Sequence, residues 1–278
     1  MLADIIEYLR CPHCGGDLAL ADGVVGCDAG HAFDVARQGY VSLLTGRPRA
    51  GSGDNATMLA AREAFIAAGH LDPVAEALAG EARRVAGDGC VVDLGAGTGW
   101  QLARVLDVLP SRLGVALDVS GPALRRAARA HPRIGAVGCD VWGALPLRGE
   151  VAGLVLNVFA PRNGAEMARV LRSGGALLVV TPTDRHLAEL VSALGLLSVD
   201  TRKRERLERE LGDRLPISRS EVVEWSMTLG PRDLEAVVAM GPSAAHVDPG
   251  AVRERIARLP DPVDVTGSVT ITVCAQAA

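Results

Sequence analysis

The sequence predicts an α/β fold, with a doubly wound and mostly parallel sheet preceded by a small N-terminal module. The first observation is that five short apolar runs alternate with helix-like segments, which is the pattern of strands joined by crossover helices. The second is that three of the six cysteines fall within the first 27 residues, a region with few helical signals. The apolar runs span 90–95, 112–119, 134–140, 151–159 and 175–182.

The helical part of the pattern starts before the first strand. Apolar residues at helical spacing predict helices over 56–69 and 72–87, and the alternation predicts further helices after residues 98, 121, 163 and 184. Near the end of the chain, 221–229 and 264–274 alternate polar and apolar residues, as half-exposed strands do. The sheet is therefore expected to finish on strands of mixed direction.

A stretch rich in glycine, proline and polar residues separates two modules. Residues 47–55, with the sequence RPRAGSGDN, have the composition of a flexible connection. We therefore predict a small N-terminal module over 1–46, a linker over 47–55 and a larger domain over 56–278. The total length of 278 residues is long for one compact domain, which agrees with this division.

Composition limits the class of protein. With 49% hydrophobic and 22% charged residues and no apolar run of membrane-spanning length, we expect a globular protein with no membrane partner. The first residues contain no basic leader or cleavage site, so we expect a cytoplasmic protein. The net charge of −4 argues against nucleic-acid binding by the whole surface and leaves room for local basic patches. The isolated Cys90, Cys139 and Cys274 are expected to be ordinary buried residues.

Four residues near the N-terminus have the spacing of zinc ligands. Cys11, Cys14, Cys27 and His31 form the pattern C-x2-C-x12-C-x3-H. Two turns with paired ligands close a tetrahedron around Zn²⁺, and four protein ligands indicate a structural site. His13 is a rival nitrogen ligand, although its position between two cysteines on one tight turn does not favour it. Reduced cysteines in a small core are the other interpretation, but so short a segment has few other sources of stability.

A glycine-rich loop joins the first predicted strand to its helix. Residues 91–99, VVDLGAGTG, let the backbone pass close to a ligand at a helix N-terminus, so we expect a nucleotide-like ligand. Trp100 stands where the dinucleotide fingerprint has its last glycine, which disfavours NAD. The motif resembles the first motif of class I methyltransferases, whose glycine loop holds the amino-acid part of S-adenosylmethionine. The expected cofactor-binding residues here are Asp93, Gly95, Gly97, Thr98 and Gly99.

Polar residues also end the next three predicted strands. Asp118, 25 residues beyond Asp93, is expected to accept both ribose hydroxyls of a nucleoside, with a helix cap as its alternative. Asp140 stands where such enzymes contact the adenine ring, and Asn157 closes the fourth strand beside the expected methyl group. Plain turn-forming roles stay open for Asp140 and Asn157.

Longer segments extend the likeness over nearly the whole chain. Beside the cysteine module and the glycine loop, these segments are FDVARQGYV at 33–41, AR at 61–62, GH at 69–70, NVFAPRN at 157–163, HLAEL at 186–190 and VAMGPS at 238–243. Together they resemble the bacterial 23S rRNA guanine-N1 methyltransferases, and within them the tylosin-resistance branch of macrolide producers.

The resemblance implies a class I methyltransferase-like fold, with the S-adenosylmethionine-dependent methyltransferase domain over 56–278. It also implies that 1–46 is a zinc-binding module for RNA recognition, with a structural zinc ion on the four residues above. It implies contacts to the cofactor from Leu71, Gly97, Thr98 and His186. Three positions depart from the family pattern: Leu71 replaces a tyrosine that often follows the Gly-His pair, Ser42 replaces a usual asparagine, and Ala245 stands where an aromatic residue is common. These departures affect the expected target more than the expected methyl transfer.

The resemblance also implies a reaction. We expect a methyl group to pass from S-adenosylmethionine to N1 of a guanine in a hairpin loop of 23S rRNA, naked or in a ribosomal particle, with macrolide resistance as the physiological role. Guanine N1 carries a proton, and our hypothesis is that Asp140 accepts or orients it while Asn157 fixes the base edge. A small-molecule methyltransferase and a non-catalytic zinc-ribbon regulator that senses the cofactor stay open as alternatives. The sequence also leaves a homodimer open.

Aromatic and basic side chains are candidates for RNA contacts. An unstacked guanine favours an aromatic platform, for which the candidates are Trp100, Phe159 and Tyr40. Phosphates favour arginines in acid-free stretches, which are Arg37, Arg47 and Arg49 in one place and Arg125, Arg126, Arg129 and Arg133 in another. A solvated helix face is the alternative for the second set. The segment 201–214, TRKRERLERELGDR, interleaves acids with bases and predicts an exposed helix, to which we assign no functional role.

Overall fold

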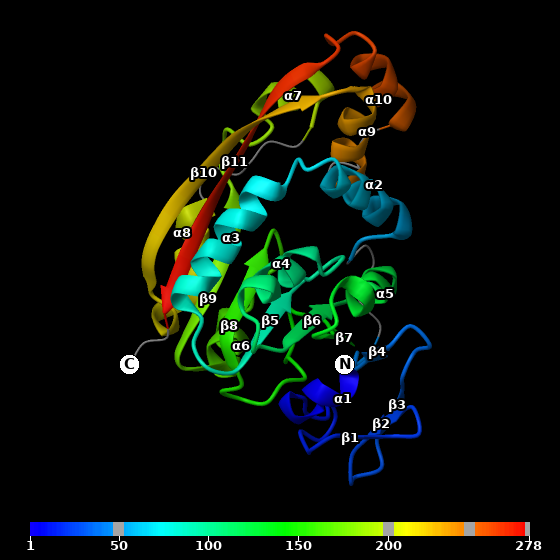
Figure 1. Ribbon diagram of the computed structural model, residues 1–278, viewed down its shortest axis with the longest axis vertical. Helices are drawn as coiled ribbons and strands as arrows, with labels where there is room; N and C mark the ends of the chain where they lie inside the picture. The colour runs from blue at the N-terminus through cyan, green and yellow to red at the C-terminus, as the bar shows by residue number, and fades with distance from the viewer. Residues whose placement is uncertain (47–52, 197–202, 242–247, 276–278) are drawn as a thin grey trace.

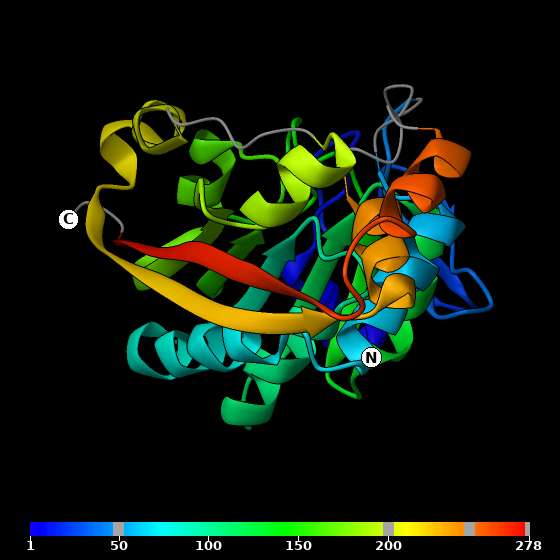
Figure 2. The same cartoon turned by 90° about the horizontal axis from the view of Figure 1, so that it is seen from above.

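The computed structural model describes residues 1–46, 53–196, 203–241 and 248–275. Its main body is an eight-stranded sheet in the order β10-β11-β9-β8-β5-β6-β7-β4, with helices on both faces (Figures 1 and 2). The neighbours from β9 to β4 are parallel, whereas β11 is antiparallel to both β9 and β10. These strands are β4 (Tyr40–Ser42), β5 (Cys90–Leu94), β6 (Gly114–Asp118), β7 (Ile134–Gly138), β8 (Ala152–Val158), β9 (Leu171–Pro182), β10 (Ile217–Leu229) and β11 (Val263–Ala275). The predicted doubly wound, mostly parallel sheet is confirmed.

The central strands are apolar because they are covered from both sides. Every residue of β5, β6 and β7 is buried, which explains why each appears in the sequence as a continuous apolar run. The strand β11 is more buried than its alternating pattern predicts. Its small polar residues Ser268 and Thr272 are buried, and their hydroxyls bond to Thr183 Oγ1 at 2.7 Å and Ser220 Oγ at 3.2 Å. Side-chain hydrogen bonds thus allow both faces of β11 to be covered.

Helices pack on the two faces of the sheet and at one end of it. Figure 2 shows α3 and α4 on one face and α6 and α8 on the other. In Figure 1, α2, α9 and α10 lie together at one end of the sheet, and we call these three helices the helical cap. The helices are α1 (Leu2–Ile5), α2 (Ala56–Ala67), α3 (Asp72–Val85), α4 (Trp100–Val108), α5 (Gly121–Ala130), α6 (Gly164–Val170), α7 (Ala188–Leu194), α8 (Lys203–Leu211), α9 (Pro231–Met240) and α10 (Pro249–Ile256), with 3-10 turns η1 (Ile6–Tyr8) and η2 (Gly212–Arg214). Across the described residues, none of these helices has both the length and the apolar character needed to cross a bilayer.

The predicted helices over 56–69 and 72–87 are confirmed as α2 and α3. Asn55 fixes the start of α2, because its Oδ1 accepts hydrogen bonds from the backbone amides of Thr57 and Met58, both at 3.0 Å. Pro73 stands in the first turn of α3, where a missing N–H costs nothing.

The N-terminal segment shares its core with the large sheet. Its own sheet is small, with the antiparallel strands β1 (Ala19–Ala21), β2 (Val24–Gly26) and β3 (Ala32–Asp34). The next strand, β4, pairs with β7, and Ile5, Leu9 and Val41 belong to the same buried cluster as Val137. The boundary that we predict after residue 46 therefore follows a strand that already belongs to the large sheet. Most of the predicted linker, 47–52, lies outside the described residues.

Candidate active site and zinc centre

The glycine-rich loop lies at the carboxyl end of β5. Gly95, Gly97 and Gly99 have φ angles of 74°, 55° and 76°, which favour glycine because a side chain strains this backbone. The amides of Gly95 and Ala96 donate to Leu117 O at 2.8 and 3.0 Å, so the loop is fixed to the neighbouring strand β6. A Cβ on Gly99 would lie 2.9 Å from the Cα of Ala127, and the loop therefore packs directly against α5.

Asp118 fixes the same loop from the carboxyl end of β6. Its two carboxylate oxygens accept hydrogen bonds from the backbone amides of Gly97 and Ser120, both at 2.8 Å. Burial raises the pKa of Asp118, while the hydrogen bonds from Ser120 and Gly97 act in the opposite direction. Each oxygen keeps a further lone pair, so the carboxylate can also accept from a ligand.

Asp93 lies beneath the loop and has a strongly shifted acidity. Its side chain is 2% exposed, and burial followed by the negative charge of Asp118 raises its pKa to about 7. The two carboxyl groups thus differ in role. Asp118 accepts backbone hydrogen bonds, whereas desolvation is the main cause of the raised pKa of Asp93.

Asn157 ends β8 with an unsatisfied acceptor. Its Nδ2 donates to Pro161 O at 2.8 Å, whereas Oδ1 is buried with no partner among the described residues. The hydroxyl of Thr98 in the glycine loop is buried without a partner as well. A buried polar atom left unpaired costs about 1–3 kcal/mol, so two such atoms at one edge of the sheet indicate a place where a ligand supplies the missing partners.

Three neighbouring rings, those of Phe159, His186 and Trp225, lie close to the end of β8. Phe159 has a φ of 53° and is 47% exposed, and its ring centre lies 6.2 Å from that of His186. The ring of His186 is in turn 6.3 Å from Trp225, and its Nδ1 accepts from Ser268 N at 3.1 Å. The structure thus brings Phe159 and His186 together from strands that are adjacent in the sheet.

The turn between α2 and α3 reaches the same group through its backbone. Trp225 Nε1 donates to His70 O at 2.9 Å. Leu71 comes next, and its side chain is only 8% exposed and belongs to the main buried cluster with Phe65. A cofactor contact from Leu71 stays a prediction, and its side chain serves the core.

Arg62 of the helical cap lies over the glycine loop. Its guanidinium pairs with Asp54 and donates to Met240 O at 3.1 Å, which joins α2 to α9. A Cβ on Gly97 would meet Arg62 Nη1 at 3.2 Å. The sequence offered Arg62 only as part of a family segment, because nothing in its neighbourhood along the chain indicates that it faces Gly97.

Asp140 and Asn157 stand at well-separated strand ends. Asp140 follows β7, where its Oδ1 accepts from Trp142 N at 3.0 Å in a local turn. The sheet order inserts β5 and β6 between β7 and β8, so three strand spacings of about 4.8 Å separate the two strand ends, roughly 14 Å in all. The end of β5, which carries the glycine loop, lies between these two strand ends, while the loops beyond them meet where Asn163 Nδ2 donates to Trp142 O at 3.1 Å.

The aromatic candidates for an RNA platform have different environments. Phe159 is exposed, whereas Trp100 and Tyr40 are partly buried against the core. Trp142, which the sequence analysis did not single out, is 45% exposed. Its signal in the sequence is weak, because a tryptophan shortly after an apolar strand is as typical of a core as of a surface.

The arginines expected to contact phosphates also differ in their environments. Arg37, Arg125 and Arg129 are exposed, and Arg47 and Arg49 lie outside the described residues, as does Ala245. Arg126 is engaged within the protein, since its Nε lies 2.9 Å from Glu63 Oε2. Arg133 donates to three backbone carbonyls, those of Leu106, Leu109 and Arg112, so it closes the end of α4 and is unsuited to a phosphate.

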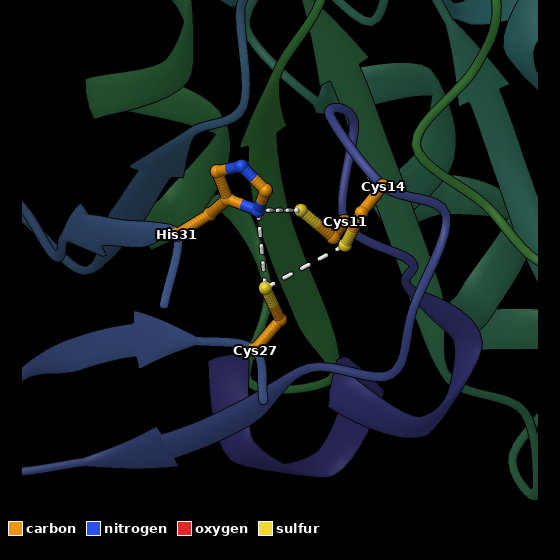
Figure 3. Close-up of side chains that lie close together, drawn as sticks. All are labelled: Cys11, Cys14, Cys27 and His31. Atoms are coloured by element: carbon orange, nitrogen blue, oxygen red, sulfur yellow. Dashed lines mark hydrogen bonds between the residues drawn. The ribbon is translucent and has the colours of Figure 1, made fainter. Parts of the chain in front are cut away.

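The four predicted metal ligands converge on one point. The ligand atoms of Cys11, Cys14, Cys27 and His31 all lie within 4.8 Å of one another (Figure 3). The Sγ atoms of Cys14 and Cys27 are 3.7 Å apart, and His31 Nδ1 lies 3.5 Å from Cys11 Sγ and 3.3 Å from Cys27 Sγ. A tetrahedron with Zn–S bonds of about 2.3 Å has edges of about 3.8 Å, so the set fits Zn²⁺ with four protein ligands.

Two tight turns present these ligands. Gly15 N donates to Cys11 O at 2.8 Å, and Gly30 N donates to Cys27 O at 2.9 Å. His13 lies outside the ligand set, with its ring stacked on Phe33 at 5.9 Å between centres. The four ligands are therefore those of the predicted pattern, and the rival His13 packs beside them.

These features define a class of protein. The protein has a mostly parallel sheet with a glycine-rich loop at the carboxyl edge, and it has a zinc ribbon with three cysteines and one histidine. It is a class I methyltransferase that uses S-adenosylmethionine and carries structural zinc. The family model described as "RlmA, N-terminal", a zinc ribbon, matches residues 9–47.

Similarity to known proteins extends over the whole chain. The chain is 52% identical to the 23S rRNA (guanine(748)-N(1))-methyltransferase of Streptomyces fradiae, over 99% of each chain. It is 50% identical, over 98% of each chain, to a Micromonospora griseorubida protein provisionally named a 23S rRNA (guanine-N(1)-)-methyltransferase. A Bacillus subtilis (strain 168) protein with the same provisional name is 30% identical over 66% of this chain and 67% of the relative. The chain belongs to the 23S rRNA (guanine-N1)-methyltransferase family.

Loss of one zinc ligand should destabilise more than the ribbon. We expect Cys27→Ser to abolish stoichiometric zinc binding and to lower the melting temperature by about 5 °C or more, because the metal supplies folding free energy to a segment that shares its core with the sheet. Metal analysis and thermal unfolding measure both effects. His13→Ala is the matched control and should keep one zinc ion per chain. Retention of zinc by the Cys27 variant would contradict the assignment.

The acidity of Asp93 predicts a pH dependence of stability. Its pKa of about 7 in the folded protein lies above the ordinary value of 3.8, so the folded state holds this proton more tightly. Below pH 4 this contribution to the free energy of unfolding is fully present, and it is lost as the pH rises through about 7. Asp93→Asn should flatten this part of the profile in urea unfolding between pH 4 and 8, whereas Asp34→Asn at an exposed site should not. Equal slopes for wild type and Asp93→Asn would refute the shift.

Proposed function

We propose that this protein transfers a methyl group from S-adenosylmethionine to N1 of a guanine in a hairpin loop of 23S rRNA. The observation that carries the proposal is the 52% identity, over 99% of each chain, to the Streptomyces fradiae enzyme. A match of that extent includes the zinc ribbon, the glycine loop and the helical cap together. A methyltransferase for small molecules would need the glycine loop and would have no use for a zinc ribbon built into the sheet.

The proposed cofactor site uses the carboxyl ends of β5, β6 and β7. The backbone of the glycine loop, with Thr98, would hold the amino-acid part, and the remaining lone pairs of Asp118 would accept the ribose hydroxyls. Asp140, beyond β7, would lie on the adenine side. His186 and the turn at Leu71 would border the opposite side, where Phe159 is exposed.

Asn157 is the proposed contact to the reacting base. Bound S-adenosylmethionine supplies an electrophilic methyl group on its sulfonium, so the protein mainly has to hold guanine N1 in line and exclude water. Because Pro161 O fixes the amide of Asn157, Oδ1 is left to accept an N–H of the guanine edge. The exposed ring of Phe159, two residues on, would stack on the extruded base.

The separation of strand ends changes our hypothesis for Asp140. The ends of β7 and β8 are three strand spacings apart, roughly 14 Å, which favours separate roles for Asp140 and Asn157. We therefore assign Asp140 to the nucleoside and leave Asn157 with the base.

The nature of the substrate follows from where guanine N1 is accessible. In a duplex N1 is part of the base pair, so the target has to be an unpaired or extruded base, as in a hairpin loop. Either naked RNA or a ribosomal particle presents such loops. An rRNA substrate implies a cytoplasmic enzyme, and macrolide resistance is the physiological role that we infer from the tylosin-resistance resemblance. A homodimer stays a prediction, which the mass of the protein in solution would test.

A methylation assay tests the proposed function. Zinc-loaded protein incubated with tritiated S-adenosylmethionine and unmodified large-subunit rRNA should incorporate label, and reverse transcription should stop at one guanine in a hairpin loop, because N1 methylation blocks base pairing. Ribosomal particles are tested in parallel. Absence of label in both substrates, with cofactor binding intact, would rule out RNA methylation and favour a small-molecule acceptor.

The two polar residues should affect different kinetic constants. Asn157→Ala should lower kcat by about 100-fold or more, with cofactor affinity unchanged, since it removes a contact made at the reacting base. Asp140→Asn should raise KM for S-adenosylmethionine by about 10-fold with kcat unchanged, and it keeps the acceptor for Trp142 N. Each variant is the control for the other. A drop in kcat for Asp140→Asn at saturating cofactor would restore it as a proton acceptor.

A further inference from the structure

An open groove lies beside the candidate active site, on the face of the sheet that carries α6 and α8. Its volume is about 440 Å³. It is lined by the turn at Trp142, the first residues of α6, the end of α8 and η2. The residues that matter for its chemistry are Trp142, Arg162, Arg209, Glu210 and Arg214.

We propose that this groove binds single-stranded RNA next to the methylated guanine, with Trp142 stacking on a base and the arginines meeting phosphates. The inference rests on the proposed function, because it names a contact to the same RNA. It concerns residues for which no role was expected from the sequence, since α8 lies in the segment predicted to be a plain exposed helix.

Trp142 has an exposed side chain on a backbone that hydrogen bonds fix. Asn163 Nδ2 donates to Trp142 O at 3.1 Å and to Gly143 O at 3.0 Å. On the other side, Trp142 N donates to Asp140 Oδ1 at 3.0 Å. These bonds fix the backbone at Trp142, and its side chain is 45% exposed. An exposed aromatic ring is a platform on which an unpaired base can stack.

Basic residues predominate in the groove. Its charged lining residues are three arginines and one glutamate, and Glu210 is already paired, with Arg162 Nε at 2.6 Å and Arg206 Nε at 2.8 Å. Arg209 and Arg214 are exposed. The groove is therefore basic in a protein with a net charge of −4, which favours a phosphate backbone as its occupant.

The groove adjoins the loops that follow β7 and β8. Trp142 follows Asp140 by two residues, and Arg162 follows Asn157 by five, so both walls of the groove begin in loops of the candidate active site. The floor is rigid because α6 and α8 meet backbone to backbone, where a Cβ on Gly164 would overlap Glu210 O. An RNA strand that leaves the active site past Phe159 thus meets the groove within a few residues of chain.

Substitutions separate this inference from the proposed function. With the rRNA fragment that the wild type methylates, Trp142→Ala should raise the RNA KM by about 5- to 100-fold, the range of one base–aromatic stack, with kcat at saturating RNA and cofactor affinity unchanged. Trp142→Phe should stay within about threefold of wild type. Arg214→Glu should raise the RNA KM and reduce its dependence on salt. The controls are Val222→Ala, 60% exposed on β10, and Arg83→Glu, exposed on α3, and both should match wild type.

Each outcome bears on one claim. An unchanged RNA KM in both Trp142→Ala and Arg214→Glu, with an active wild type, would overturn the groove and leave the methyltransferase assignment intact. A wild type inactive on RNA and on particles would overturn the proposed function. Quenching of the total fluorescence of the three tryptophans by a single-stranded oligoribonucleotide would then test the groove by itself: the quenching should be lost in Trp142→Phe and kept in Trp225→Phe, and equal quenching in both variants would overturn the groove. If Trp142→Ala and Arg214→Glu lost activity on ribosomal particles and kept it on naked rRNA, the groove would contact a ribosomal protein instead of RNA, which would contradict the proposal.

Discussion

The parallel direction of β5, β6, β7 and β8 is the constraint on which the site depends. Because these strands all end at one edge of the sheet, the glycine loop, Asp118, Asp140 and Asn157 gather at that edge from distant parts of the chain. Asp118 then fixes the loop through Gly97 N, and this hydrogen bond offsets part of the cost of burying the carboxylate. The helical cap closes over the same edge through Arg62.

The zinc ribbon and the Trp142 groove are connected to this edge through one face of the sheet. Ile5 and Leu9 of the N-terminal segment, Met167 of α6 and Leu207 of α8 belong to a single buried cluster. Zinc therefore stabilises a segment whose apolar residues cover the same face as the helices that line the groove. The N-terminal segment therefore packs on the same face of the sheet as α6 and α8, and an RNA in the groove would lie on that face.

The surface aromatic residues show where inference from sequence fails. Of the three candidates from the sequence, Phe159 is exposed, whereas Tyr40 and Trp100 pack partly against the core. Trp142, which was not among them, is exposed beside arginines of α8 and η2. Exposure of a large side chain depends on what the rest of the chain places over it. No local pattern distinguishes Trp142 from a buried tryptophan, and no local pattern brings residues 209–214 beside it.

The sequence by itself determined the features that depend on neighbours along the chain. The apolar runs identify buried strands, the cysteine and histidine spacing identifies the zinc ligands, and the glycines identify the loop, because each is a property of a few consecutive residues. The tertiary structure decided which strands lie side by side. Only that order separates Asp140 from Asn157, and only packing assigns Arg133 to the end of α4 and Arg126 to Glu63. Crossover connections make strands parallel but do not determine which strands become neighbours. Contacts across the sheet therefore depend on the tertiary structure.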